Sequence, residues 1–230
     1  MDHASLDAAR HRMEDEFREL RPVLRGVSHA VSFWIALAAS VLLVALVDGG
    51  AERAAAVVYG IGLCTLFGAS GTYHRWRWDP RWRPVLRRVD HGAIFIFIAA
   101  SYTPISLLVL DGAWRWSILA VVWAGAIAGV AMSVFWIDAP RWLVAGVYLA
   151  LGWVAIAATP KLVDALPPAP LALLAAGGLL YSGGAVIYAL KRPDPWPRVF
   201  GFHEIFHALV IAAAATHFVA LAGWVFGASA

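Results

Sequence analysis

The chain has little charge and a single cysteine. Asp, Glu, Lys and Arg make up 14% of its 230 residues, and hydrophobic residues make up 61%. Soluble domains carry about 25% charged residues, so the composition argues against a soluble protein. Cys64 has no second cysteine to pair with, which excludes an intrachain disulfide.

Long polar segments are also absent after the first 25 residues. Seven apolar stretches are long enough to cross a bilayer, and the short connections between them leave no room for a second soluble domain. These stretches cover residues 29–47, 54–73, 91–110, 114–135, 142–159, 170–190 and 203–226. We therefore predict an all-α integral membrane protein, with a seven-transmembrane helix bundle formed by residues 26–230.

Residues 1–25 are polar and charged, so they are not a cleavable signal peptide. Among their charges of both signs, apolar residues recur at helical spacing: Leu6, Met13, Phe17, Leu20 and Leu24. This pattern predicts a cytoplasmic tail with an amphipathic helix that lies on the inner leaflet.

The Lys and Arg residues lie mostly on one side of the predicted bundle. Ten of them fall in the connections after spans two, four and six, and three fall in the connections on the opposite side. Under the positive-inside rule, this distribution predicts a multi-pass inner-membrane protein with its N-terminus in the cytoplasm and its C-terminus outside. The basic clusters alternate with Trp76, Trp78, Trp82 and Trp196, so we expect membrane lipids as their partners and no nucleic acid.

The most informative motif is the His-Glu-x-x-His string of residues 203–207, at the start of the last span. Its two histidines share one helix face, an arrangement that lets two imidazoles bind one metal ion. On the predicted topology, His74 ends span two and Asp90 begins span three at the same cytoplasmic depth. Ser70 lies one turn deeper than His74, on the same face. Ionisable groups near lipid need partners, so we expect these residues to meet.

Three histidines and a carboxylate at one depth favour a zinc site. His74, His203 and His207 would supply three ligands and leave the fourth tetrahedral position for water or substrate, as in catalytic zinc sites. Zinc lowers the pKa of bound water to about 7, and Asp90 would take the proton. Ser70 would donate a hydrogen bond to this water or to a developing oxyanion. Iron and manganese are the alternative metals.

The same motif also fits a zincin metalloprotease, with Glu204 as general base. Such a site needs a third ligand downstream, and the sole candidate, His217, lies about 15 Å further along the helix. Glu204 points about 100° away from His203 around the helix. We therefore expect Glu204 to lie at the margin of the site or to pair with Arg198 or another interfacial cation.

Structural roles compete with each of these interpretations. The three histidines can instead bond to backbone or headgroups, and Asp90 can pair with Arg87 or Arg88. Ser70 can serve close helix packing. His29 and His217 lie deeper on the predicted topology, where an ordinary buried histidine is as expected as a second polar site.

Four motifs together resemble one known family. They are Ser70-Gly-Thr-Tyr-His74, Val89-Asp90-His91-Gly-Ala-Ile94, Ser101-Tyr102-Thr103-Pro104 and Gly201-Phe202-His203-Glu204-Ile-Phe-His207. From about Arg25 to Phe226 the chain resembles the haemolysin III family. Its members are bacterial relatives of the progestin and adipoQ receptors, which include the adiponectin receptors, and more distantly of alkaline ceramidases.

The resemblance implies a seven-helix fold in which His74, His203 and His207 ligate zinc, Asp90 holds or activates the metal-bound water, and Ser70 completes the polar site. The eukaryotic relatives imply amide-hydrolase activity toward ceramide-type lipids, whereas the bacterial members carry a haemolysin label. Two classes of function follow. One is a zinc-dependent hydrolase of an amide or ester bond in a lipid-like substrate. The other is a membrane-homeostasis, receptor-like or pore-forming cytolytic protein in which zinc is structural.

Overall fold

The computed structural model describes residues 22–226, and every regular element within that range is a helix. Seven helical segments are long and apolar enough to cross a membrane, which confirms the predicted number of spans. They are α2 (Val27–Leu46), α3 (Gly50–Arg75), α4 (Arg83–Leu108), α5 (Gly112–Phe135), the pair α6 (Arg141–Gly152) and α7 (Ala155–Ala165), α8 (Pro168–Leu190), and α9 (Phe202–Ala220) with its π-helical end η1 (Leu221–Val225). The predicted amphipathic helix of the tail lies outside the described residues.

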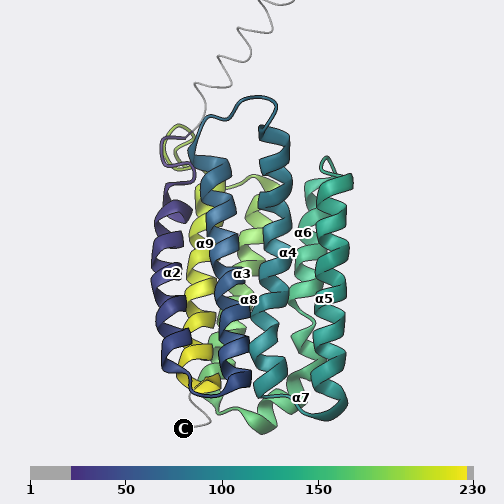
Figure 1. Ribbon diagram of the computed structural model, residues 1–230. Helices are drawn as coiled ribbons and strands as arrows, with labels where there is room; N and C mark the ends of the chain where they lie inside the picture. The colour runs from purple at the N-terminus through teal and green to yellow at the C-terminus, as the bar shows by residue number, and fades with distance from the viewer. Residues whose placement is uncertain (1–21, 227–230) are drawn as a thin grey trace, which may run out of the picture.

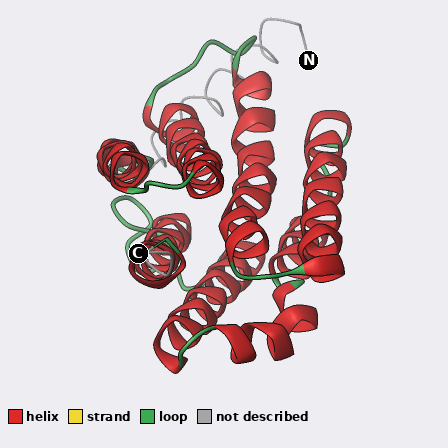
Figure 2. Cartoon of the chain, turned by 60° about the horizontal axis from the view of Figure 1, so that its bottom comes forward, coloured by secondary structure: helices red, strands yellow, loops and turns green. Residues whose placement is uncertain are grey.

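The helices run alternately up and down and form one bundle (Figure 1). Helices α2, α4, α6 and α9 begin at the end drawn uppermost in Figure 1, where α3, α5 and α8 finish; we call this the polar end. Consecutive helices pack side by side, and α9 contacts both α8 and α2. Figure 2 shows the same bundle turned so that the opposite end comes forward. The first and last spans are therefore neighbours.

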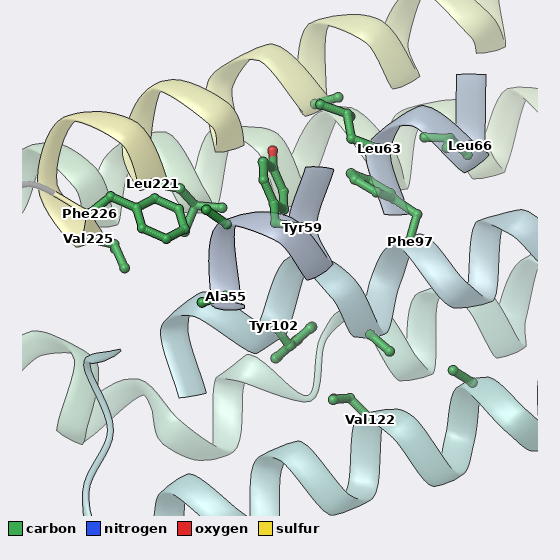
Figure 3. Packing of buried hydrophobic residues seen from close by; sticks show 14 of the residues in the cluster. Ala55, Tyr59, Leu63, Leu66, Phe97, Tyr102, Val122, Leu221, Val225 and Phe226 are labelled. Atoms are coloured by element: carbon green, nitrogen blue, oxygen red, sulfur yellow. The ribbon is translucent and has the colours of Figure 1, made fainter. Parts of the chain in front are cut away.

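Apolar side chains cover both the outside and the inside of the bundle. On α2, Val31, Trp34 and Ile35 are exposed on the outer face, as expected for a helix that faces lipid. Inside, Tyr59 of α3 packs between Phe97 of α4 and Phe218 of α9, with ring centroids 6.3 and 6.2 Å away. Figure 3 shows this buried cluster, which η1 joins from the end opposite the polar end.

Two predicted span boundaries are wrong. Helix α4 begins at Arg83 and not at residue 91, because the charged segment before Asp90 is helical and Pro84 fits the first turn of a helix. The fifth span, predicted as residues 142–159, extends over 141–165 as α6 and α7. Asp90 therefore lies about two turns inside α4.

A tyrosine from α4 bridges the break between α6 and α7. The Tyr102 hydroxyl donates to the carbonyl of Gly152 at 2.6 Å and accepts from the N–H of Ala155 at 2.8 Å. Backbone groups freed at a helix break inside a membrane need such partners because no bulk water is available. One side chain thus satisfies both sides of the break.

Candidate metal centre

Three histidines from two helices that are far apart in the sequence converge at the polar end. His74 lies in the last turn of α3, and His203 and His207 lie in the first two turns of α9. Each offers one ligand atom within 4.8 Å of the others, and we call this set the histidine cluster. The Nε2 atoms of His74 and His203 are 3.2 Å apart. The predicted meeting of spans two and seven is therefore present in the structure.

The Asp90 carboxylate joins this cluster from α4. Its Oδ2 lies 3.3 Å from Nε2 of His74, the same nitrogen that faces His203. The alternative pairing with neighbouring arginines is not found, because Arg87 pairs with Asp138 at 3.0 Å and Arg88 donates to the carbonyl of Val134. Nε2 of His74 thus contacts both the Asp90 carboxylate and the imidazole of His203.

The histidine cluster has the donor set of a zinc site, and one pair of its nitrogens has the spacing of zinc ligands. Zinc–nitrogen bonds of about 2.0–2.1 Å in a tetrahedron separate two ligand nitrogens by about 3.3 Å. The observed distance of 3.2 Å between the Nε2 atoms of His74 and His203 is close to that value. Neutral imidazoles are ligands that zinc prefers, so the residues present fit the metal.

Ser70 meets a histidine that the sequence analysis placed elsewhere. The Ser70 hydroxyl lies 2.8 Å from Nδ1 of His29, and both side chains are buried. The imidazole of His29 also stacks on that of His207, with ring centroids 3.8 Å apart and planes inclined by 7°. The prediction that His29 lies deeper than the cluster is wrong, because α2 begins at Val27 and its first turn lies at the polar end.

Close backbone packing places His29 there. Gly26, which has φ +76°, lies against the end of α3, where a Cβ atom would be 2.7 Å from backbone and side-chain atoms of His74. One turn away, a Cβ on Gly71 would be 3.0 Å from backbone atoms of Ala30. Because glycine has no Cβ atom, these two positions allow α2 and α3 to approach closely. This approach brings the imidazole of His29 to Ser70 and the histidine cluster.

Glu204 serves the helix end and does not face the cluster. Its carboxylate forms an ion pair with Arg25 and accepts a hydrogen bond from the N–H of Gly201 at 2.9 Å. The predicted pairing with an interfacial cation is present, although Arg25 and not Arg198 is the partner. Together with the turn before α2, this contact fixes the start of α9. The zincin interpretation finds no support, because Glu204 is committed to Arg25 and Gly201.

The remaining histidines have separate environments. Nε2 of His217 lies 3.1 Å from the carbonyl oxygen of Leu174, far along α9 from the cluster. The carbonyl of His91 accepts a hydrogen bond from the Tyr148 hydroxyl at 3.0 Å. Neither imidazole belongs to the group with metal-ligand spacing among the described residues.

A cavity of about 1750 Å³ connects the cluster with the interior of the bundle. Its wall includes His203 near the polar end and His217 at the far end, which are about 21 Å apart along α9. Between them the wall is mainly apolar and aromatic, with Ile94, Phe97 and Val210 among its residues. Such a lining suits a long hydrocarbon chain, and the polar cluster lies at one end of it.

Comparison with known proteins gives the family. A family model described as haemolysin-III related matches residues 17–218. The chain belongs to the haemolysin-III-related family. The matched range includes Ser70, Asp90 and the whole histidine cluster, so the family segment contains every predicted site residue.

Individual relatives of this haemolysin-III-related protein come from bacteria, animals and plants. It is 29% identical to hemolysin-3 of Bacillus cereus over 201 residues, which cover 85% of this chain and 88% of the relative. It is 31% identical to the monocyte to macrophage differentiation factor of Homo sapiens over 212 residues, 84% of this chain and 80% of the relative. A shorter match, 45% over 56 residues, covers 22% of this chain and 24% of the heptahelical transmembrane protein ADIPOR2 of Oryza sativa subsp. japonica. The likeness to a heptahelical transmembrane protein agrees with the seven spans.

Proposed function

We propose that this protein is a zinc-dependent hydrolase that cleaves an amide or ester bond in a lipid-like substrate. The observation that carries the proposal is the position of the histidine cluster and Asp90 at the polar end of a long apolar cavity. A purely structural metal site closes its coordination with protein ligands, whereas three histidines leave one position open for chemistry. The family relationship is consistent with this proposal.

The residues have distinct roles in this proposal. His74, His203 and His207 hold zinc, which when bound acts as a Lewis acid and makes water acidic enough to ionise near neutral pH. Oδ2 of Asp90 accepts the proton of the attacking water and returns it to the leaving group. The Ser70 hydroxyl donates a hydrogen bond to the carbonyl oxygen as negative charge develops there.

The cavity favours a substrate with at least one long apolar chain. The apolar chain of the substrate occupies the cavity between α4, α8 and α9, and its scissile carbonyl lies at the polar end beside Asp90. A water-soluble substrate would leave this apolar wall uncovered. We further propose that the polar end faces the cytoplasm of a bacterial inner membrane, in keeping with the distribution of basic residues.

An Asp90→Ala variant tests the proposal. Purified protein in lipid nanodiscs is loaded with zinc, and release of a fluorescent acyl chain from an N-acyl sphingoid base and from an acyl ester is followed. We expect turnover to fall by roughly 100- to 10,000-fold with zinc content unchanged. The control is Asp164→Ala on α7, an exposed carboxylate near the opposite end of the bundle. Zinc-loaded wild-type protein that hydrolyses neither substrate would reject the hydrolase.

The name of the Bacillus cereus relative, hemolysin-3, favours a second candidate, a lytic membrane protein in which zinc is structural. This candidate predicts leakage of a trapped dye from liposomes that contain the purified protein. Liposomes that remain tight while the substrate is hydrolysed would exclude it and support the hydrolase. Leakage from vesicles that contain the inactive Asp90→Ala variant would favour the lytic function.

A further inference from the structure

His29 makes two contacts with the proposed catalytic site. Its side chain is 2% exposed, it lies 2.8 Å from the Ser70 hydroxyl, and it stacks on the imidazole of His207. No other described residue joins a proposed metal ligand to the proposed oxyanion donor in this way. We infer that His29 is a positioning residue that fixes both the imidazole plane of His207 and the direction of the Ser70 hydroxyl. This inference rests on the proposed function.

The contact with His207 replaces a support that metal ligands usually have. A ligating histidine normally donates its second ring N–H to a carboxylate, a carbonyl or water, and that bond fixes the orientation of the ring. With Nε2 of His207 as the ligand, the second ring nitrogen is Nδ1, which is buried and has no hydrogen-bond partner among the described residues. The flat face of His29, 3.8 Å away and nearly parallel, restrains the same rotation by packing.

The Ser70 hydroxyl bonds to His29 and not to its own helix. Ser133 and Ser182 show the common alternative, since each donates to the carbonyl four residues earlier, that of Gly129 and that of Gly178. Within residues 22–226 the Ser70 hydroxyl makes its hydrogen bond with His29 and none with the carbonyl of Leu66. His29 therefore holds the hydroxyl away from its own helix.

The inference specifies one tautomer of His29. Nδ1 lies 2.8 Å from Oγ of Ser70, and in the tautomer with the hydrogen on Nδ1 the imidazole donates to this oxygen. The hydroxyl hydrogen of Ser70 is then free to point into the cavity, whose wall includes Ser70. This is the direction in which a carbonyl oxygen of a bound substrate needs a donor.

Two substitutions separate the two contacts. His29→Phe keeps an aromatic ring against His207 and removes the donor to Ser70. His29→Asn keeps an amide nitrogen near the position of Nδ1 and removes the ring. His217→Phe is the matched control for zinc affinity, since this buried histidine lies outside the histidine cluster. All variants are compared as folded protein in nanodiscs, with thermal stability recorded.

Zinc affinity, measured by competition with a chromophoric chelator, tests the contact with His207. We expect His29→Asn to weaken zinc binding by roughly 10- to 100-fold, and we expect His29→Phe and His217→Phe to bind within a few-fold of wild type. This readout needs no enzyme activity. Equal zinc affinity in wild type and His29→Asn would overturn the His207 contact.

Turnover of the fluorescent N-acyl sphingoid base by zinc-saturated protein tests the contact with Ser70. We expect His29→Phe and Ser70→Ala each to lower kcat by roughly 100-fold, with little change in KM. We expect the double variant His29→Phe/Ser70→Ala to fall no further. Additive losses, or unchanged kcat in His29→Phe, would overturn this contact. Wild-type protein that binds no zinc would overturn this inference together with the proposed function. If zinc-loaded wild-type protein shows no turnover, the proposed role of the His29–Ser70 contact is rejected. The zinc-affinity measurement then still decides the role of the His29–His207 contact.

Discussion

Removing the Tyr102 hydroxyl tests how the break in the fifth span is stabilised. Tyr102→Phe keeps the buried ring and removes one donor and one acceptor, so the carbonyl of Gly152 and the N–H of Ala155 lose their partners. Each such hydrogen bond contributes about 0.5–1.5 kcal/mol, and water is scarce inside the membrane. We expect a loss of about 1–3 kcal/mol in the free energy of unfolding.

Tyr148→Phe is the matched control. Its hydroxyl makes one hydrogen bond, to the carbonyl of His91, and that carbonyl lies within α4, where the helix itself supplies a donor. The expected loss is therefore about 0.5–1 kcal/mol. Reversible unfolding in mixed detergent micelles, followed by tryptophan fluorescence, gives both values. A Tyr102→Phe variant no less stable than Tyr148→Phe would refute the proposed bridge across the break.

Three further predictions concern the polar end and the topology. Gly26→Ala should lower stability by about 2 kcal/mol and weaken metal binding, because its Cβ would be 2.7 Å from His74 at a positive φ. Gly146→Ala, whose Cβ meets no atom within 4 Å, should leave the unfolding midpoint nearly unchanged, and equal effects would contradict this reasoning. Glu204→Ala should cost about 2–4 kcal/mol by leaving Arg25 unpaired and the start of α9 uncapped, whereas Glu204→Gln should cost less in the same assay. A periplasmic reporter fused to the C-terminus should be active, and a signal from a cytoplasmic reporter there would overturn the predicted orientation.

The number of spans and the residues of the histidine cluster could be predicted from the sequence for simple reasons. Long apolar runs separated by short polar connections leave few alternatives to a helical bundle. His203 and His207 share a face because they are four residues apart. Alternation of the spans then places His74 at the same end, and the structure brings these three side chains together. The metal itself stays a prediction.

The start of α4, the contacts of His29 and the ion pair between Arg25 and Glu204 depend on packing that sequence patterns do not record. Charges before Asp90 hid the true start of α4, since hydropathy marks the apolar part of a helix and not its ends. His29 is the first residue of the predicted first span, so alternation of the spans already places it at the polar end, and the deeper position was a mistaken interpretation. A second signal is Gly26, which precedes α2 and puts His29 in its first turn. The contact between Arg25 and Glu204 joins residues 179 positions apart and follows only from the meeting of the first and last spans.

X-ray absorption at the zinc edge of the purified wild-type protein is the most direct test of the proposed metal centre. The proposal predicts bound zinc with three imidazole nitrogens at about 2.0–2.1 Å and one oxygen ligand. Bound zinc without an imidazole shell, or protein that retains no zinc after purification in zinc-containing buffer, would contradict it.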